Sequence, residues 1–465
     1  MTKTRQESDS LGTVDVPVDR LWGAQTERCL MNFPIGSDVM PTPFVRALGL
    51  QKKAAALANK NLGLLDGKLA DAIALAAGEV AGGKHDAEFP LPVWQTGSGT
   101  QSNMNANEVI ANRASELLGG VRGTKEPVHP NDHVNMGQSS NDTIPTVMLV
   151  SAAQELEGRL LPALEAMASS IATFRARFGD VIKLGRTHFQ DATPITLDQA
   201  FSAYQAQVEA AMVALRQQLP RLTAVPQGGT AVGTGLNCHP DFAKHFCHHL
   251  SDLAGRVFTP AANKFAGISA HDELVALSGV LNGVAAALMK IAGDIRLMGS
   301  GPRGGLGELI LPKNEPGSSI MAGKVNPTQV EALTMVCAQV MGNHTTVTIA
   351  GSQGQLELNA CKPVIIHNVL QSLRLLADAA DSFTERCLNG LKPAPERIDN
   401  LLKSSLMLAT SLVPHIGYDK TAEIARLAND EKLLLKEAAL RLGYVSAEDF
   451  DRWTDPSQMI GPSSD

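Results

Sequence analysis

Several residue patterns are missing from this 465-residue chain, and each absence narrows its possible structure. Aromatic residues make up only 4% of the chain, so its cores must be built mainly from Leu, Val, Ile, Ala and Met. A core that is rich in alanine and poor in aromatics favours close packing of helices over sheets. No convincing run of alternating polar and apolar residues predicts strands, and no βαβ pattern is present. The composition therefore points to a helical protein.

A net positive charge is also missing. The formal charge of −7 argues against nucleic acid or an anionic membrane as the main partner. It also means that an anionic substrate gains nothing from the overall field of the protein. Any anion site must therefore be local, built from a few cations and backbone N–H groups.

Paired cysteines, a signal peptide and a clear membrane span are absent too. The first ten residues are polar and charged, and no apolar stretch is long and uninterrupted enough to predict a span. Scattered cysteines without C-x-x-C spacing argue against a zinc site or a disulfide framework and for reduced thiols. These six are Cys29, Cys238, Cys247, Cys337, Cys361 and Cys387. We expect a cytoplasmic protein.

Long amphipathic helices are the main positive signal. Apolar residues over 272–298 follow an unbroken 3-4 spacing, and no charged residue lies between Glu273 and Lys290. This pattern predicts a helix buried on nearly every side, in a central bundle or among partner subunits. Similar patterns predict helices over about 147–177, 197–219, 327–349 and 362–389. The predicted fold is all-α, with domains at 1–138 (short helices and turns), 139–393 (long helical bundle) and 394–465 (small and helical).

Four segments rich in Gly, Ser, Thr and Asn interrupt these helices, each at or near the start of a helix. Unpaired N–H groups and the positive end of the helix dipole favour anions there. In segment 95–105, Ser98 and Thr100 offer hydroxyl donors and the glycines permit close backbone approach, although a turn with a helix cap has the same pattern. In segment 129–142, Ser139, Ser140 and Asn141 could donate to a carboxylate.

A second polar cluster lies at the start of segment 129–142 and contains His129, Asn131 and Asp132. His129, Asp132 and His133 could also ligate a metal, but their spacing matches no metal motif that we recognise. The third segment, 185–199, places His188 before a capping box formed by Thr196 and Gln199. A lone loop histidine is also common as a surface or capping residue.

The fourth segment, 317–327, places Lys324 just ahead of a helix that is predicted to begin with Asn326 as N-cap and Pro327 as first residue. A cation beside the positive end of a helix is unfavourable unless an anion joins it. The alternative is a mobile glycine-rich loop with a solvated lysine. Four loops of this kind in one chain fit a dicarboxylate site better than four unrelated loops.

The Gly317–Pro327 string resembles the signature loop of the fumarase/aspartase superfamily, and the other three strings match that superfamily in order over essentially the whole chain. The strings Gly97-Ser-Gly-Thr100 and Arg186-Thr-His188 resemble the class II fumarase branch, since aspartases carry Gly-Ala-Gly-Thr and a glutamine in place of the histidine. The resemblance implies a three-domain helical chain that forms a homotetramer around a helix core. Each active site would combine loops from three subunits.

The implied activity is the reversible, anti addition of water to fumarate, giving (S)-malate in the tricarboxylic acid cycle. It implies no cofactor and no metal, and neither nucleic acid nor a membrane as partner. Ser318 would be the catalytic base, and His188, supported by Glu331, the acid/base partner. The substrate-binding residues would be Ser98, Gly99, Thr100, Ser139, Ser140, Asn141, Thr187, Ser319, Lys324, Val325 and Asn326. A second dicarboxylate site would be formed by His129, Pro130, Asn131 and Asp132.

Two other functions stay open at this point. One is aspartate ammonia-lyase or another fumarate-releasing lyase of the same superfamily, such as an argininosuccinate- or adenylosuccinate-cleaving enzyme. The other is a non-catalytic structural protein on this scaffold, like the lens crystallin relatives of the superfamily. Such a protein should have lost Ser318, His188 or Lys324, and all three are present. Ala322 stands where family members usually have proline, which predicts a looser signature loop.

Overall fold

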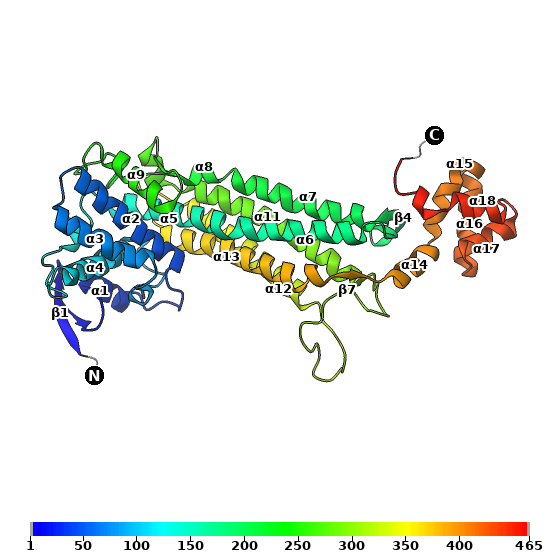
Figure 1. Cartoon of the computed structure of the whole chain (residues 1–465), viewed down its shortest axis with the longest axis horizontal. Coiled ribbons are helices and arrows are strands. Elements are labelled where there is room, and N and C mark those ends of the chain that lie inside the picture. The colour runs from blue at the N-terminus through cyan, green and yellow to red at the C-terminus, as the bar shows by residue number, and fades with distance from the viewer. Residues whose placement is uncertain (1–2, 463–465) are drawn as a thin grey trace. The chain divides into compact units, whose positions relative to one another are not determined.

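The computed structural model describes residues 3–462, and its regular structure is dominated by helices (Figure 1). The chain forms two compact units, each assembled from separate stretches of sequence. The first unit contains Met1–Pro162, Val213–Ala285 and Ala338–Ala377, and the second contains Ala163–Met212, Ala286–Cys337 and Asp378–Asp465. The long helices contribute residues to both units: α6 (Leu161–Phe178), α7 (Leu197–Arg216), α11 (Asp272–Met298), α12 (Thr328–Gly351) and α13 (Lys362–Arg386).

The first unit consists of helices and two small ladders. Its other helices are α1 (Ala24–Asn32), α2 (Thr42–Asn61), α3 (Gly67–Ala81), α4 (Thr100–Leu117), α5 (Ser140–Glu155), α8 (Leu219–Leu222), α9 (Phe242–Ala254) and α10 (Lys264–Ser269). An antiparallel hairpin of β1 (Thr4–Asp9) and β2 (Gly12–Pro17) precedes them, and β5 (Ala224–Val225) pairs in parallel with β6 (Thr259–Pro260). Helix α2 packs against α3, α5 and α9, and its buried alanines let these helices approach closely.

The second unit holds a longer hairpin and the C-terminal helices. Its strands are β3 (Ile182–Thr187), β4 (Gln190–Thr196), β7 (Leu309–Ile310) and β8 (Lys392–Pro393), and both of its ladders are antiparallel. Its remaining helices are α14 (Pro395–Lys403), α15 (Val413–Ile416), α16 (Tyr418–Glu431), α17 (Leu435–Leu442) and α18 (Ala447–Trp453). Leu184 of β3 joins the apolar core formed by these C-terminal helices, which anchors the hairpin on that core.

The all-α prediction is confirmed, and the helix predicted over 272–298 is α11 with the same bounds. All eight apolar residues of its 3-4 spacing are buried, from Leu274 to Met298. The expected burial on nearly every side does not occur within the single chain, since Gly283, Ala286 and Leu297 are exposed. Among residues 3–462, α11 is also the one helix long and apolar enough to span a membrane, a test that the core helix of a soluble protein passes equally. The division into domains 1–138, 139–393 and 394–465 stays a prediction.

Three expectations about local structure were wrong. Segments 4–17 and 182–196 were not expected to form strands, yet they pair as the β1–β2 and β3–β4 hairpins. The helix expected over 147–177 begins earlier, at Ser140, and a π-helical turn at Leu156–Leu160 separates α5 from α6. The helices of the N-terminal part are not all short, since α2 has 20 residues and α4 has 18.

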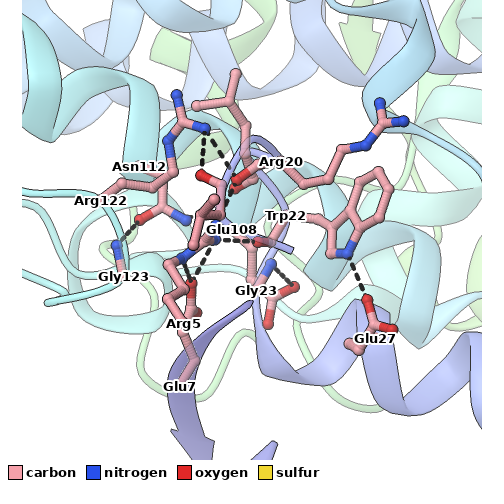
Figure 2. Close-up of polar contacts among 12 residues, drawn as sticks. Arg5, Glu7, Arg20, Trp22, Gly23, Glu27, Glu108, Asn112, Arg122 and Gly123 are labelled. Carbon is pink, nitrogen blue, oxygen red and sulfur yellow. Dashed lines mark hydrogen bonds and ion pairs between the residues drawn. The ribbon is translucent and has the colours of Figure 1, made fainter. Parts of the chain in front are cut away.

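A buried carboxylate ties the N-terminal hairpin region to α4, the helix that begins at Thr100. Helix α1 has no side-chain cap of its own. Glu108 of α4 supplies one, because its carboxylate accepts the backbone N–H groups of Gly23, Gln25 and Thr26 at 2.8–3.1 Å. Figure 2 shows the contact between Glu108 and Gly23. Burial raises the pKa of Glu108. Arg5 of β1 donates to backbone carbonyls just ahead of α1, which holds the hairpin to the same place.

Candidate active site

Three hydroxyls form a continuous row where two helices of the first unit begin. Ser98 Oγ lies 2.8 Å from Thr100 Oγ1, which lies 2.8 Å from Ser140 Oγ. Thr100 is the first residue of α4, and Ser140 is the first residue of α5. Two positive helix ends and three hydroxyls therefore meet at one place, an arrangement that favours an anion.

Glycines let the chain make this turn. Gly99, the residue before α4, has φ +74, a left-handed conformation that favours glycine. Gly97 lies against the backbone of segment 359–362, and a Cβ placed on it would stand 1.5 Å from Ala360 O. Gly97 O also accepts the backbone N–H of Lys362 at 3.0 Å. The predicted close backbone approach thus occurs, but to another loop of the protein.

The start of α5 is fixed by a capping box. Ser139 Oγ accepts the backbone N–H of Asn141, and the Asp142 carboxylate accepts the N–H of Ser139 at 2.9 Å. The other Asp142 oxygen accepts the N–H groups of Gly228 and Thr230, each at 2.9 Å. Burial raises the pKa of Asp142 to about 6, and these hydrogen bonds act in the opposite direction. Asp142 therefore holds the serine turn in place.

The predicted second site forms a π-helical turn in the first unit. His129 Nδ1 accepts the N–H groups of Asn131 and Asp132, at 3.2 and 3.1 Å. His133 Nδ1 likewise accepts the N–H of His129 at 2.8 Å. Pro130 is buried, whereas Asn131 and Asp132 are exposed. Both imidazoles thus cap backbone through Nδ1, and within residues 3–462 no cluster of three or more His, Cys, Asp or Glu side chains could hold a metal.

His188 lies in the second unit at the tip of the β3–β4 hairpin. Thr187 pairs with Gln190, which makes His188 and Phe189 the two turn residues, with φ +56 and +59. Left-handed φ at both turn positions ordinarily selects Asn or Gly, so the backbone of these two residues is strained. Phe189 is 80% exposed. Strain of this kind is common at functional sites.

A buried carboxylate anchors the hairpin from beneath. Glu308 is fully buried, and both of its oxygens lie 2.9 Å from Arg186 Nη1. Lys183 Nζ lies 3.5 Å from the same carboxylate, and burial lowers the pKa of this lysine. A cavity of about 460 Å³ opens beside the hairpin and is lined by His188 and Arg186 together with residues of α7 and α11.

The signature loop, Gly317–Pro327, lies in the second unit ahead of α12. Ser318 Oγ accepts the backbone N–H groups of Ile320 and Met321, at 3.3 and 2.9 Å. The loop closes on itself, because Gly317 N donates to Lys324 O at 3.1 Å and the Asn326 side chain donates to Gly317 O. Ser318, Lys324 and Val325 line a cavity of about 470 Å³, and Ser319 is exposed.

The predicted residues thus fall into separate groups. The structure joins Ser98, Thr100 and Ser140 in one row, and it joins Ser318, Lys324 and Asn326 in one loop. Asn141 donates its side-chain amide to Ala231 O. Glu331, in the first turn of α12, lies 3.6 Å from Arg296. Among the residues described, no hydrogen bond links His188 to Ser318, and the cavities that they line share no residue.

Sequence reasoning missed the buried charged groups behind these loops. Glu308 lies under the histidine hairpin, Lys52 under the turn before α5, and Lys362 behind the Gly97 loop. Each is fully buried. Lys52 sits in an alanine-rich amphipathic helix, where a lysine ordinarily faces water, so the sequence carried no signal for it. The Thr196–Gln199 capping box was predicted and is confirmed, with both bonds at 3.0 Å.

Comparison with known proteins agrees with this architecture. Residues 12–342 match a family model described as Lyase, and residues 408–461 match one described as Fumarase C C-terminus. The class II fumarate hydratase of Methylorubrum extorquens is 59% identical over 100% of this chain and 98% of its own length. The mitochondrial fumarate hydratase of Dictyostelium discoideum is 58% identical over 99% of this chain and 96% of its own.

Solved structures give the same result. The crystal structure of class II fumarase from Schistosoma mansoni superposes with a TM-score of 0.96 at 46% identity, and covers 99% of this chain and 100% of that one. A fumarate lyase:delta crystallin from Brucella melitensis reaches a TM-score of 0.95 at 41% identity, over 99% of this chain and 100% of that one. The match extends over the whole length of the sequence and of the fold, and the chain belongs to the class II fumarate hydratase family of the fumarase/aspartase superfamily.

Proposed function

We propose that this chain is a hydro-lyase that catalyses the reversible hydration of fumarate to (S)-malate. The observation that carries the proposal is the row formed by Ser98, Thr100 and Ser140 at the convergent N-termini of α4 and α5. Such a row offers donors to a carboxylate without requiring a positively charged protein surface. The relatives named above are fumarate hydratases along their whole length.

The chemistry of malate dehydration determines what the site must stabilise. Dehydration of malate breaks the C3–H bond, whose proton is barely acidic. The electron pair left on C3 is tolerable only if it is delocalised into the neighbouring carboxylate, which becomes a dianionic aci-form. Loss of hydroxide from C2 then forms the double bond, and a proton donor converts the hydroxide to water. The site must therefore stabilise extra negative charge on one carboxylate.

Ser318 is proposed as the base that takes the C3 proton. A hydroxyl is a weak base unless its alkoxide is stabilised. Two backbone N–H groups already point at Ser318 Oγ, and Lys324 is fixed in the same loop by its backbone bond to Gly317. Hydrogen bonds and a nearby cation both favour the ionised form.

Lys324 and Asn326 are proposed to hold the carboxylate that gains charge. Donors that are already in place at a developing oxyanion often supply the largest single contribution to catalysis. Val325 and Ser319 of the same loop are proposed to contact the substrate beside them. The other carboxylate would be bound by Ser139, Ser140 and Asn141 with the Gly99–Thr100 turn, so that the C2 hydroxyl and the C3 hydrogen lie on opposite faces.

His188 is proposed to protonate the departing hydroxide, directly or through a water, with Thr187 beside it and Glu331 supporting the imidazole. His188 lies at the strained hairpin tip and lines the cavity beside it. Because the proposed groups form separate clusters within one chain, we propose a homotetramer in which each active site takes loops from different copies. His129, Pro130, Asn131 and Asp132 are proposed as a second dicarboxylate site, and the location is proposed to be the cytoplasm.

An absorbance assay tests the proposed reaction. Purified protein is mixed with (S)-malate alone, and the ultraviolet absorbance of the fumarate double bond is followed. A rise with (S)-malate, absent with L-aspartate and with argininosuccinate, is the expected result. A rise with one of the latter two only would assign a different lyase of the superfamily, and no rise with any substrate would favour the structural protein.

A further inference from the structure

A lysine is buried beneath the start of α5, where nothing in the proposed chemistry uses it. Lys52 of α2 is 0% exposed. Its ammonium donates to Asn135 Oδ1 at 3.0 Å and to Gln138 Oε1 at 2.9 Å. Gln138 directly precedes Ser139, and the Asn135 side chain in turn donates to Gln138 O at 3.2 Å. Lys52 therefore holds the turn that leads into α5 at two points.

The surroundings of Lys52 are side-chain amides. Gln51 donates to Gln138 and to Gln227, both at 2.9 Å, and Asn103 of α4 donates to Asn135 Oδ1 at 3.2 Å. This network reaches both helices whose N-termini carry the hydroxyl row. Two of its amide oxygens, those of Asn135 and Gln138, accept from the one ammonium, so the cation determines how these two amides are oriented.

A counter-ion in direct contact is absent. Across residues 3–462, Lys52 forms no ion pair within 4.0 Å. The negative charge that acts on it is Asp142, whose oxygens are occupied by backbone N–H groups of Ser139, Gly228 and Thr230. Burial lowers the pKa of Lys52 to about 7, and Asp142 acts in the opposite direction.

An ammonium buried in this way lowers the stability of the fold. A buried charge without a paired partner is costly, and an apolar side chain of the same length is usually tolerated at least as well. A group that opposes stability inside a well-packed unit is expected to serve function. The feature next to it that gains from a positive charge is the anion-binding start of α5.

We propose that Lys52 is a positioning residue of the dicarboxylate site, which fixes the Asn135–Gln138 turn and places a positive charge under the N-terminus of α5. This inference rests on the proposed function. Lys52 would then have two effects. Its hydrogen bonds keep the hydroxyl row in place, and its charge raises the affinity of the site for anions, more for a dianion than for a monoanion. A purely structural role would produce only the first effect.

Two saturated four-carbon probes distinguish these effects: succinate, a dianion, and succinamate, its monoanionic monoamide. Binding of each is measured by titration calorimetry to wild type, to Lys52→Met and to Lys53→Met. Lys53 is the neighbouring, partly exposed lysine and serves as the matched control. We expect Lys52→Met to lower the affinity for succinate about tenfold, as for a unit charge acting over several ångströms in a protein interior. The affinity for succinamate should fall by less than about threefold. Lys53→Met should leave both unchanged.

Lys52→Gln keeps a polar side chain and serves as a second variant, in case the methionine variant does not fold. It should show the same preferential loss of succinate. The KM for (S)-malate should rise in parallel with the dissociation constant of succinate, with a smaller change in kcat. Equal losses for both probes, or wild-type affinity in both Lys52 variants, would overturn the inference. Malate turnover by the wild type tests the proposed function separately, since the binding measurements do not depend on it.

Discussion

The contact between Gly97 and Ala360 allows a prediction about a residue that carries no chemistry of its own. A Cβ added to Gly97 would lie 1.5 Å from Ala360 O and 2.3 Å from its carbonyl carbon, whereas real Cβ atoms essentially never come within 3.0 Å of another heavy atom. Both sides of the contact are backbone, so no side chain can rotate away. In Gly97→Ala the two loops must therefore separate by about 1.5 Å, the difference between the 1.5 Å approach and the 3.0 Å limit.

That separation acts on the adjacent hydroxyl row. Ser98 follows Gly97 directly and Thr100 lies three residues after it, and their 2.8 Å contacts would be broken by a movement of that size. A misplacement of about 1 Å in a positioning group can lower activity by about 100-fold. We expect kcat/KM for (S)-malate to fall by about that factor, and the free energy of unfolding to fall by about 1–3 kcal/mol from overpacking.

Steady-state kinetics and urea unfolding of the purified variant measure the two effects. Gly158→Ala is the matched control, because a Cβ there meets nothing within 4 Å. It should retain wild-type turnover and lose no stability, because alanine is the better helix former. If Gly97→Ala kept kcat/KM within about threefold of wild type, well short of the expected 100-fold loss, the argument that this contact sets the hydroxyl row would be refuted.

Four further predictions follow from the site and its buried charges. Ser318→Ala and His188→Asn should each lower kcat by orders of magnitude while the circular dichroism spectrum stays unchanged, and near-wild-type turnover in either would remove its proposed role. Lys324→Met should abolish malate recognition, so an unchanged KM would count against it. Glu308→Gln leaves the buried Lys183 and the partly buried Arg186 without their carboxylate and should lower the unfolding free energy by about 3–5 kcal/mol, measured by urea unfolding; a loss below about 1 kcal/mol would contradict the anchor. Burial lowers the pKa of His271 to about 3 from 6.5, so its contribution to stability is full above pH 6.5 and is lost as the pH falls toward 3; the urea midpoint should decline across that window in wild type and decline less in His271→Gln.

The sequence was informative where a single physical pattern decides the structure. The apolar 3-4 spacing of α11 continues from end to end without a charge in its middle, so its bounds and its buried face could be predicted. Its expected burial on nearly every side does not hold within the single chain, where Gly283, Ala286 and Gly293 are exposed. The Thr196–Gln199 capping box could be predicted because both partners lie three residues apart on one segment. The sequence predicted hydroxyl donors in two separate loops but not that they form one row. Thr100 and Ser140 are brought together by tertiary packing, which the sequence pattern does not reveal.

The hairpin that carries His188 could not be predicted, because its local sequence argues against it. Gly185 and Pro194 weaken the strand pattern, and the His188-Phe189 turn lacks the Asn or Gly that such a turn prefers. The hairpin is held instead by contacts distant in sequence, from Glu308 beneath it and from the C-terminal core. Tertiary contacts of this kind override local propensity and leave no trace in the segment itself.

The central claim is that catalytic groups of different copies combine in each active site, and subunit complementation tests it most directly. Ser318→Ala and His188→Asn proteins, each inactive alone, are unfolded together, refolded as a mixture and assayed with (S)-malate. If the serine and the histidine of one site come from different copies, random mixing should restore about a quarter of wild-type activity, since that fraction of sites receives both intact groups. Activity no higher than that of either variant alone would contradict the claim.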